Sequence, residues 1–160
     1  MEKFILPAQE IPSVLYRVQH RWYYVPPCGY VTRGVYALNI IEKEPSTLKN
    51  LVKEVNNHMW LTIPPRGHVG TIWPSPFVSV YSTWEDAENS LRARGGKPGD
   101  GMWRVFEVSG KEVAATGCKV MRMKDIKGTD DVPESELLIW RFIPEEAFVR
   151  TYPWTGPPSK

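Results

Sequence analysis

The segment PSPFVSVYSTWEDAENSL, residues 74–91, changes from a strand pattern to a helix pattern at a single corner. Residues 77–81 are rich in β-branched and aromatic side chains and follow a proline, which is typical of a strand. Ser82 is followed three residues later by Glu85, and this capping-box pattern predicts the start of a helix. The helix is expected over 84–94, with Gly95 and Gly96 as its stop signal.

The patterns on either side of this segment give an element order typical of an α+β protein. A strand is expected over 14–19, and the apolar spacing of 48–59 predicts an amphipathic helix. Two strands, one from Met102 and one from Val113, would form a hairpin around Gly110. The run ELLIWRF, 136–142, predicts a further strand at the centre of a sheet. Helices are thus expected mainly in the N-terminal half, so an α+β fold is favoured over a regularly alternating α/β sheet.

The chain of 160 residues is expected to form a single domain, 1–160, because it can bury one core but is short for two. The core is expected at about 14–150, followed by a proline-rich tail at 151–160. A formal net charge of +2 gives no strong field toward nucleic acid or an anionic membrane.

The two cysteines, Cys28 and Cys118, lie far apart, and only three histidines are present. These numbers disfavour a structural zinc site, so we expect no metal. The apolar stretch near the N-terminus is too short for a signal-peptide core, and no run approaches the length of a membrane span. We therefore expect a cytoplasmic protein with no membrane partner, leaving open secretion through a leader that has been removed.

Three polar side chains stand in strands that are otherwise hydrophobic: Arg17, Ser79 and Glu136. Each also has a simple structural interpretation. An arginine in a strand commonly lies at a solvated edge, a serine fills a small space, and a glutamate at a strand entry is commonly exposed.

Taken together and in this order, the three motifs resemble those of the Arg-Ser-Glu class of ADP-ribosyltransferases, the cholera-toxin-like and pierisin-like group. LYRVQHR is similar to the first motif, FVSVYS to the serine motif, and ESE with the trailing IPEEAFV to the Glu/Gln-x-Glu motif. The layout also resembles an uncharacterised domain family common in fungal proteins. The resemblance implies an ADP-ribosyltransferase-like split β-sheet core and NAD as the substrate.

The resemblance also implies roles for the catalytic candidates Glu136, Glu134 and Ser79. Glu136 would stabilise the positive charge that develops when the nicotinamide–ribose bond breaks. Ser79 would hold Glu136 in a productive rotamer. Glu134 would orient or deprotonate the acceptor, and in this class a glutamate there goes with arginine acceptors.

Further roles concern NAD binding. Arg17 offers a planar fork of donors suited to a pyrophosphate or a ribose, and His20 and Arg21 could contact phosphate. The aromatic candidates for stacking on a nicotinamide or adenine ring are Tyr81, Trp73 and Tyr23.

Three functions compete at this point. The first is an NAD-dependent ADP-ribosyltransferase, toxin-like or effector-like, with NAD glycohydrolase activity as a side reaction. The second is an inactive protein-interaction module of the same fold, because Tyr81 stands where the class has a second small hydroxyl. The third is an RNA-processing relative that handles a 2′-phosphate through Arg17, His20 and Arg21. A protein acceptor is expected first, and the charge balance leaves nucleic acid open.

Overall fold

The computed structural model describes residues 1–20, 34–36, 44–61 and 76–155. Within those ranges no helix is long and apolar enough to cross a membrane. The elements, in chain order, are η1 (Glu2–Phe4), η2 (Ala8–Glu10), β1 (Val14–His20), β2 (Gly34–Tyr36), α1 (Leu48–Leu61), β3 (Phe77–Tyr81), α2 (Trp84–Ala93), β4 (Trp103–Ser109), α3 (Gly110–Ala115), β5 (Val120–Arg122), α4 (Met123–Lys127), β6 (Glu136–Trp140), β7 (Phe142–Pro144), η4 (Glu145–Ala147) and β8 (Phe148–Pro153).

The main sheet is six-stranded and antiparallel, in the order β5-β6-β3-β1-β4-β8, and a second sheet pairs β2 with β7. β1 pairs with β4 along its whole length, from Val14 to His20. Between β1 and β3, by contrast, the only residue pair in the described chain is Tyr16 with Tyr81. The main sheet therefore opens between β1 and β3, its two central strands.

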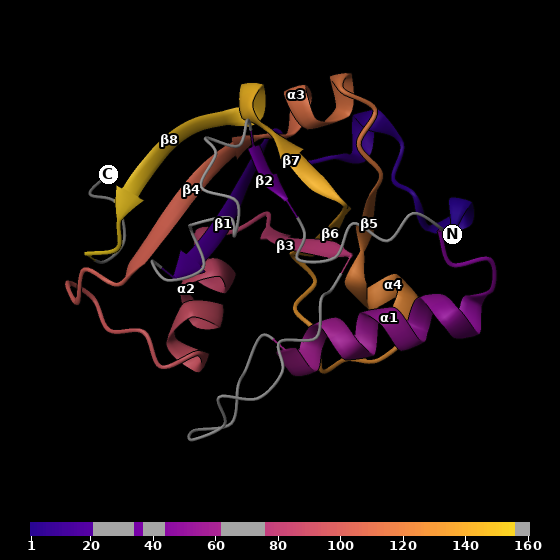
Figure 1. Ribbon diagram of the computed structural model, residues 1–160, viewed down its shortest axis with the longest axis horizontal. Helices are drawn as coiled ribbons and strands as arrows, with labels where there is room; N and C mark the ends of the chain where they lie inside the picture. The colour runs from indigo at the N-terminus through magenta and orange to yellow at the C-terminus, as the bar shows by residue number, and fades with distance from the viewer. Residues whose placement is uncertain (21–33, 37–43, 62–75, 156–160) are drawn as a thin grey trace.

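Each face of the main sheet carries its own layer (Figure 1). On one face α1 and α4 pack against β3, β5 and β6 through Leu51, Val55 and Ile126, and α2 packs against β1 and β4 through Leu91. The opposite face buries Leu15, Val78 and Ile139 under α3, β7 and η4. This arrangement confirms the α+β class.

The patterns in the first half of the chain are confirmed with small shifts. β1, α1, β3 and α2 lie where the sequence predicts them. The two longest helices of the described residues, α1 and α2, both precede Arg94 in the chain. One detail was wrong: the N-cap of α2 is Thr83, not Ser82, and Thr83 Oγ1 accepts from the Asp86 N–H. Ser82 instead uses its backbone N–H to donate to Ser135 O at 2.9 Å, which keeps it outside the helix.

The hairpin predicted around Gly110 was also wrong, because that glycine begins helix α3. Ser109 Oγ accepts from the Glu112 N–H, and this local cap prevails over the β-propensity of the valines that follow. The strand expected from Val113 is accordingly shortened to β5, and α4 follows it directly. Ser109 and Glu112 form a capping-box pattern that the sequence displays as clearly as the one before α2.

The predicted apolar strand at 136–142 becomes two strands in two different sheets. Arg141, between β6 and β7, has a φ of 72°, and this left-handed residue turns the chain from the main sheet into the pair with β2. The start of the predicted tail is also ordered, because β8 runs to Pro153 and Trp154 is buried.

Candidate functional site

The centre of the candidate site is the hydroxyl of Ser79, on the middle residue of β3. Ser79 is fully buried and lies on the face of the sheet that α1, α2 and α4 cover. Its Oγ lies 2.6 Å from His58 Nε2 on α1 and 3.0 Å from Glu136 Oε1 on β6. One hydroxyl thus joins a helix and two strands.

The hydrogen bond that Ser79 donates to Glu136 sets the role of the neutral His58 ring. Burial, followed by the charges of Arg17 and Arg94, lowers the pKa of His58 to about 3, so the ring is neutral at pH 7. With the Ser79 hydroxyl donating to Glu136, the serine oxygen can accept from His58 Nε2–H. Ser79 is therefore arranged to orient Glu136, and its full burial keeps it from acting as a nucleophile on a substrate.

Glu136, the first residue of β6, is the carboxylate of the site. It is paired across the strands with Tyr81, whose hydroxyl lies 3.3 Å from Glu136 Oε1. Burial raises the pKa of Glu136, while the hydroxyls of Ser79 and Tyr81 and the charges of Arg94 and Arg17 act in the opposite direction. Both hydroxyls contact Glu136 Oε1. The other oxygen, Oε2, has no hydrogen-bond partner in the described chain, and it is not among the buried polar atoms that lack one. Oε2 is therefore the oxygen available to a substrate.

Arg17 enters the site through the opening between β1 and β3. Its Nη1 donates to Ser79 O at 2.8 Å, so the side chain satisfies a carbonyl on the side of β3 that faces the opening. Burial, followed by the charge of Arg94, lowers the pKa of Arg17 to about 10, which still leaves it charged at neutral pH. Its Nε is buried and has no hydrogen-bond partner among the residues that the structure describes.

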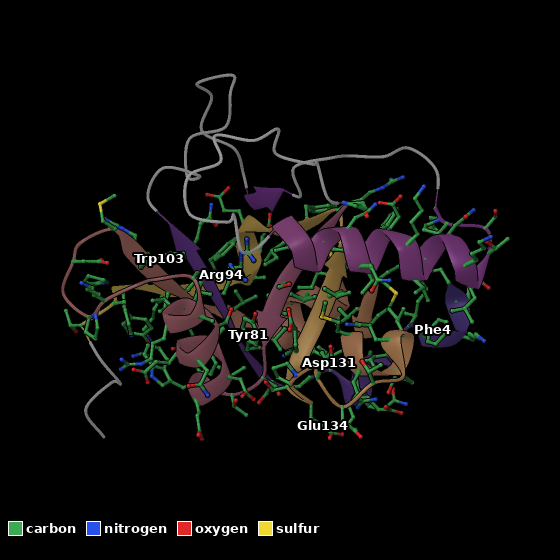
Figure 2. The ribbon with its side chains drawn as sticks, turned by 90° about the horizontal axis from the view of Figure 1, so that it is seen from below. Phe4, Tyr81, Arg94, Trp103, Asp131 and Glu134 are labelled. Atoms are coloured by element: carbon green, nitrogen blue, oxygen red, sulfur yellow. The ribbon has the colours of Figure 1, made fainter. Side chains whose placement is uncertain are left out.

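Arg94, the C-cap residue of α2, brings a second positive charge to the site (Figure 2). Its charge contributes to the pKa of Arg17, His58, Tyr81 and Glu136. Within the described ranges, the Arg94 side chain makes no hydrogen bond or ion pair. From the sequence, Arg94 is only the last residue of the helix expected over 84–94, because nothing local reveals that the end of α2 faces β3 and β6.

His58 was likewise missed as a site residue. It lies one turn beyond Val55 and two turns beyond Leu51, on the apolar face of α1. A histidine in the buried stripe of an amphipathic helix is a usable signal, since a buried imidazole requires a hydrogen-bond partner.

The structure thus brings Arg17, Ser79, Tyr81 and Glu136 together, whereas Glu134 is separate from them. The Glu134 side chain is 83% exposed and lies 3.2 Å from Lys124 Nζ. His20 pairs in β1 through its backbone, but its side chain is outside the described part of the structure. Arg21, Tyr23, Trp73 and Cys28 also lie outside the described residues.

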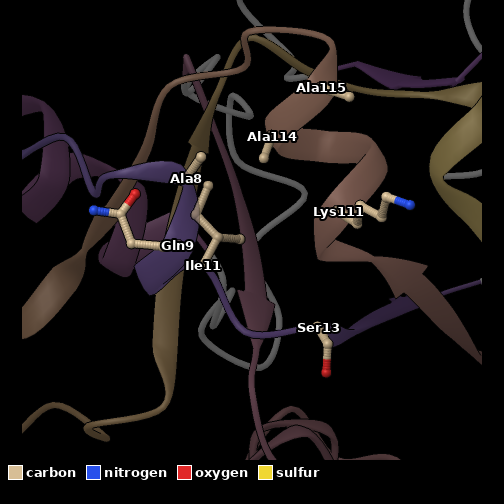
Figure 3. Close-up of a pocket in the computed structure, with 7 residues that line it drawn as sticks. All are labelled: Ala8, Gln9, Ile11, Ser13, Lys111, Ala114 and Ala115. Carbon is tan, nitrogen blue, oxygen red and sulfur yellow. The ribbon is translucent and has the colours of Figure 1, made fainter.

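A shallow hollow between η2 and α3 is unrelated to this cluster (Figure 3). Its volume is about 520 Å³, and its lining is Ala8, Gln9, Ile11, Ser13, Lys111, Ala114 and Ala115. None of these residues belongs to the cluster around Ser79, and the lining has few polar groups to orient a ligand.

Comparisons with known proteins add a structural neighbour. The chain is similar to DarT from Thermus sp. 2.9, solved in complex with ADP-ribosylated ssDNA, with 11% identity and a TM-score of 0.44 over 86% of this chain and 79% of DarT. No family model and no curated protein matches the sequence, so the likeness to a fungal domain family has no support.

Proposed function

We propose that this chain is an ADP-ribosyltransferase that cleaves the nicotinamide–ribose bond of NAD, with water as an alternative acceptor. The observation that carries the proposal is the 3.0 Å hydrogen bond from Ser79 Oγ to Glu136 Oε1, beside Arg17 in the opening of the sheet. A carboxylate held on one oxygen and free on the other suits a reaction that develops positive charge on a sugar.

In the proposed step, the bond between ribose C1′ and the nicotinamide nitrogen breaks, and its electron pair goes to nicotinamide, which leaves neutral. The ribose acquires oxocarbenium character, and Glu136 Oε2 stabilises that charge or hydrogen-bonds a ribose hydroxyl. The acceptor then forms a bond to C1′ and loses a proton. A neutral His58 assists by fixing Ser79, which in turn fixes Glu136.

The two arginines supply a fitting environment for the diphosphate of NAD. Arg17 uses Nη1 for Ser79 O, which leaves other donors of the guanidinium for a phosphate oxygen. Arg94 has no protein partner in the described chain and faces the same cluster. Arg94→Gln should raise the Kd for NAD about tenfold, the ordinary effect of losing one charge-assisted hydrogen bond.

The acceptor side of the proposal rests on Glu134. A cationic acceptor such as an arginine side chain would compete with Lys124 for this exposed carboxylate. Presenting an arginine-containing peptide and a single-stranded oligonucleotide in parallel, with wild type and Glu134→Gln, separates the two acceptor classes. If Glu134→Gln no longer transfers ADP-ribose to the peptide but still releases nicotinamide, Glu134 acts on the acceptor.

The decisive experiment measures nicotinamide release from NAD by the wild type, Glu136→Gln and the matched control Glu146→Gln. Glu146 is an exposed carboxylate on η4, outside the cluster. We expect release by the wild type and by the control, and a fall of at least about 100-fold in Glu136→Gln, the usual size of losing a charge-stabilising group. Equal release by all three proteins would contradict the proposal.

The second candidate function is an inactive protein-interaction module. The observation that favours it is Tyr81, whose buried phenol contacts Glu136 Oε1 where the class has a second small hydroxyl. No release of nicotinamide and no NAD binding by the wild type would support this alternative. NAD binding without nicotinamide release would instead indicate that the reaction requires its acceptor.

A further inference from the structure

We propose that Tyr81, supported by Ser90 of α2, is a positioning residue that fixes the carboxylate of Glu136. This inference rests on the proposed function for its consequence in catalysis, but its geometric part is independent of activity. Tyr81 and Glu136 are directly opposite each other on β3 and β6, and so lie on the same face of the sheet.

The hydroxyl of Tyr81 connects the helix layer to the carboxylate. It lies 2.7 Å from Ser90 Oγ on α2 and 3.3 Å from Glu136 Oε1. A phenol has one proton to donate. The Tyr81 hydroxyl is the donor in both contacts, so its single proton is shared between Ser90 Oγ, at the shorter distance, and Glu136 Oε1.

This second chain of hydroxyls ends on the same oxygen as the first. His58 and Ser79 reach Glu136 Oε1 from α1 and β3, and Ser90 and Tyr81 reach it from α2 and β3. Two donors on one oxygen fix both the side-chain rotamer and the direction in which Oε2 points.

The environment of the tyrosine ring argues against a direct contact with a substrate ring. Tyr81 is only 2% exposed and belongs to a core cluster that includes Val18, Ala87 and Leu91. Stacking on nicotinamide requires an open ring face, whereas the hydroxyl is already directed at the carboxylate.

Removing the Tyr81 hydroxyl should change the ionisation of Glu136. Burial raises the pKa of that carboxyl, and the hydroxyls of Ser79 and Tyr81 partly offset the rise. Losing one of the two donors should therefore move the Glu136 titration to higher pH, and with it the acidic limb of the rate profile.

The test compares Tyr81→Phe and Ser90→Ala with the matched control Tyr152→Phe. Tyr152 donates its hydroxyl to Glu107 on another part of the sheet, so the control removes a similar group outside the site. The Glu136 side-chain carboxyl is titrated by ¹³C NMR, its signal being assigned by its loss in Glu136→Gln. Nicotinamide release is measured on the same proteins as a function of pH and NAD concentration.

We expect the Glu136 titration to move to higher pH in Tyr81→Phe and to stay in place in Tyr152→Phe. It should not move to higher pH in Ser90→Ala, because that change leaves the Tyr81 proton to Glu136 alone. We also expect kcat to fall about tenfold in Tyr81→Phe, the value of one hydrogen bond to a charged group, with little change in KM. An unchanged Glu136 titration in Tyr81→Phe, or an equal shift in Tyr152→Phe, would overturn the inference. A higher KM at constant kcat would overturn it in favour of a direct NAD contact. If the wild type releases no nicotinamide, the proposed function fails, yet the titration still decides whether Tyr81 holds Glu136.

Discussion

His58 Nε2 lies 2.6 Å from Ser79 Oγ, although α1 and β3 are separated by a long connection in the sequence. Both side chains are buried, and the imidazole is neutral because burial lowers its pKa to about 3. The contact links the helix layer to the strand that carries the candidate site. It also makes the stability of the fold sensitive to acid.

The first prediction concerns that acid sensitivity. The pKa of His58 is lowered from 6.5 to about 3, so below pH 6.5 the unfolded chain binds a proton that the folded chain does not. The free energy of unfolding should therefore fall by up to about 1.4 kcal/mol per pH unit between those values on account of His58. Urea unfolding at pH 7, 6, 5 and 4 should show a shallower pH dependence for His58→Gln than for the wild type. Parallel curves for the two proteins would refute the assignment.

The second prediction concerns Glu136, whose pKa is shifted in the opposite direction. Burial raises this pKa above 4.5, so ionisation of the carboxyl opposes folding as the pH rises through the folded-state pKa. Glu136→Gln should be more stable than the wild type at pH 7, and the difference should shrink below the ordinary carboxyl pKa. The gain in stability should accompany the loss of nicotinamide release, as expected of a strained functional group. A variant that loses both stability and activity would indicate a structural role instead.

The third prediction concerns Ser79. Ser79→Ala removes the acceptor of His58 and one donor of Glu136, leaving a buried imidazole N–H without its present partner. Thermal or urea unfolding should show a loss of about 1–3 kcal/mol, the cost of one unsatisfied buried group. In the double variant Ser79→Ala, His58→Leu, the combined loss should be smaller than the sum of the two single losses. Additive losses would mean that the two side chains do not interact.

The fourth prediction concerns the segment that precedes Glu136. Ser135 is buried, and its Oγ donates to Asp86 Oδ2 at 2.5 Å, which ties this segment to the first turn of α2. Asp86→Asn should destabilise the protein by about 1–2 kcal/mol, because a short hydrogen bond to a carboxylate is lost. The matched control Glu85→Gln removes an exposed charge from the same helix turn and should have less effect. Equal effects would assign the whole loss to the helix dipole.

The fifth prediction concerns Gly110, where α3 begins. A Cβ on this residue would lie 1.8 Å from the backbone oxygen of Pro12, so even alanine forces the backbone apart. The comparison variant Gly117→Ala has open space but a φ of 72°, which costs about 1 kcal/mol for a non-glycine residue. Unfolding measurements should show a clearly larger loss for Gly110→Ala than for Gly117→Ala. A smaller loss would show that the start of α3 and the backbone at Pro12 can separate easily.

Errors in the sequence-based prediction arose where local hydrogen bonds compete with propensity. The valines after Gly110 favour a strand, yet the hydroxyl of Ser109 caps a helix first. Arg141 adopts a left-handed conformation, which is uncommon for arginine and has no sequence signal. The division of one apolar run into β6 and β7 could therefore not be predicted.

The strong periodic elements β1, α1, β3 and α2 could be predicted from local patterns, because side-chain spacing and helix caps act over a few residues. It also singled out Arg17, Ser79 and Glu136 as polar residues in apolar strands. Three relationships could not be predicted from local patterns. The sheet opens between β1 and β3, His58 and Arg94 reach the cluster from two helices, and Tyr81 is directed at Glu136. These relationships depend on strand order and on the placement of helices over one face, which arise from burial across the whole chain.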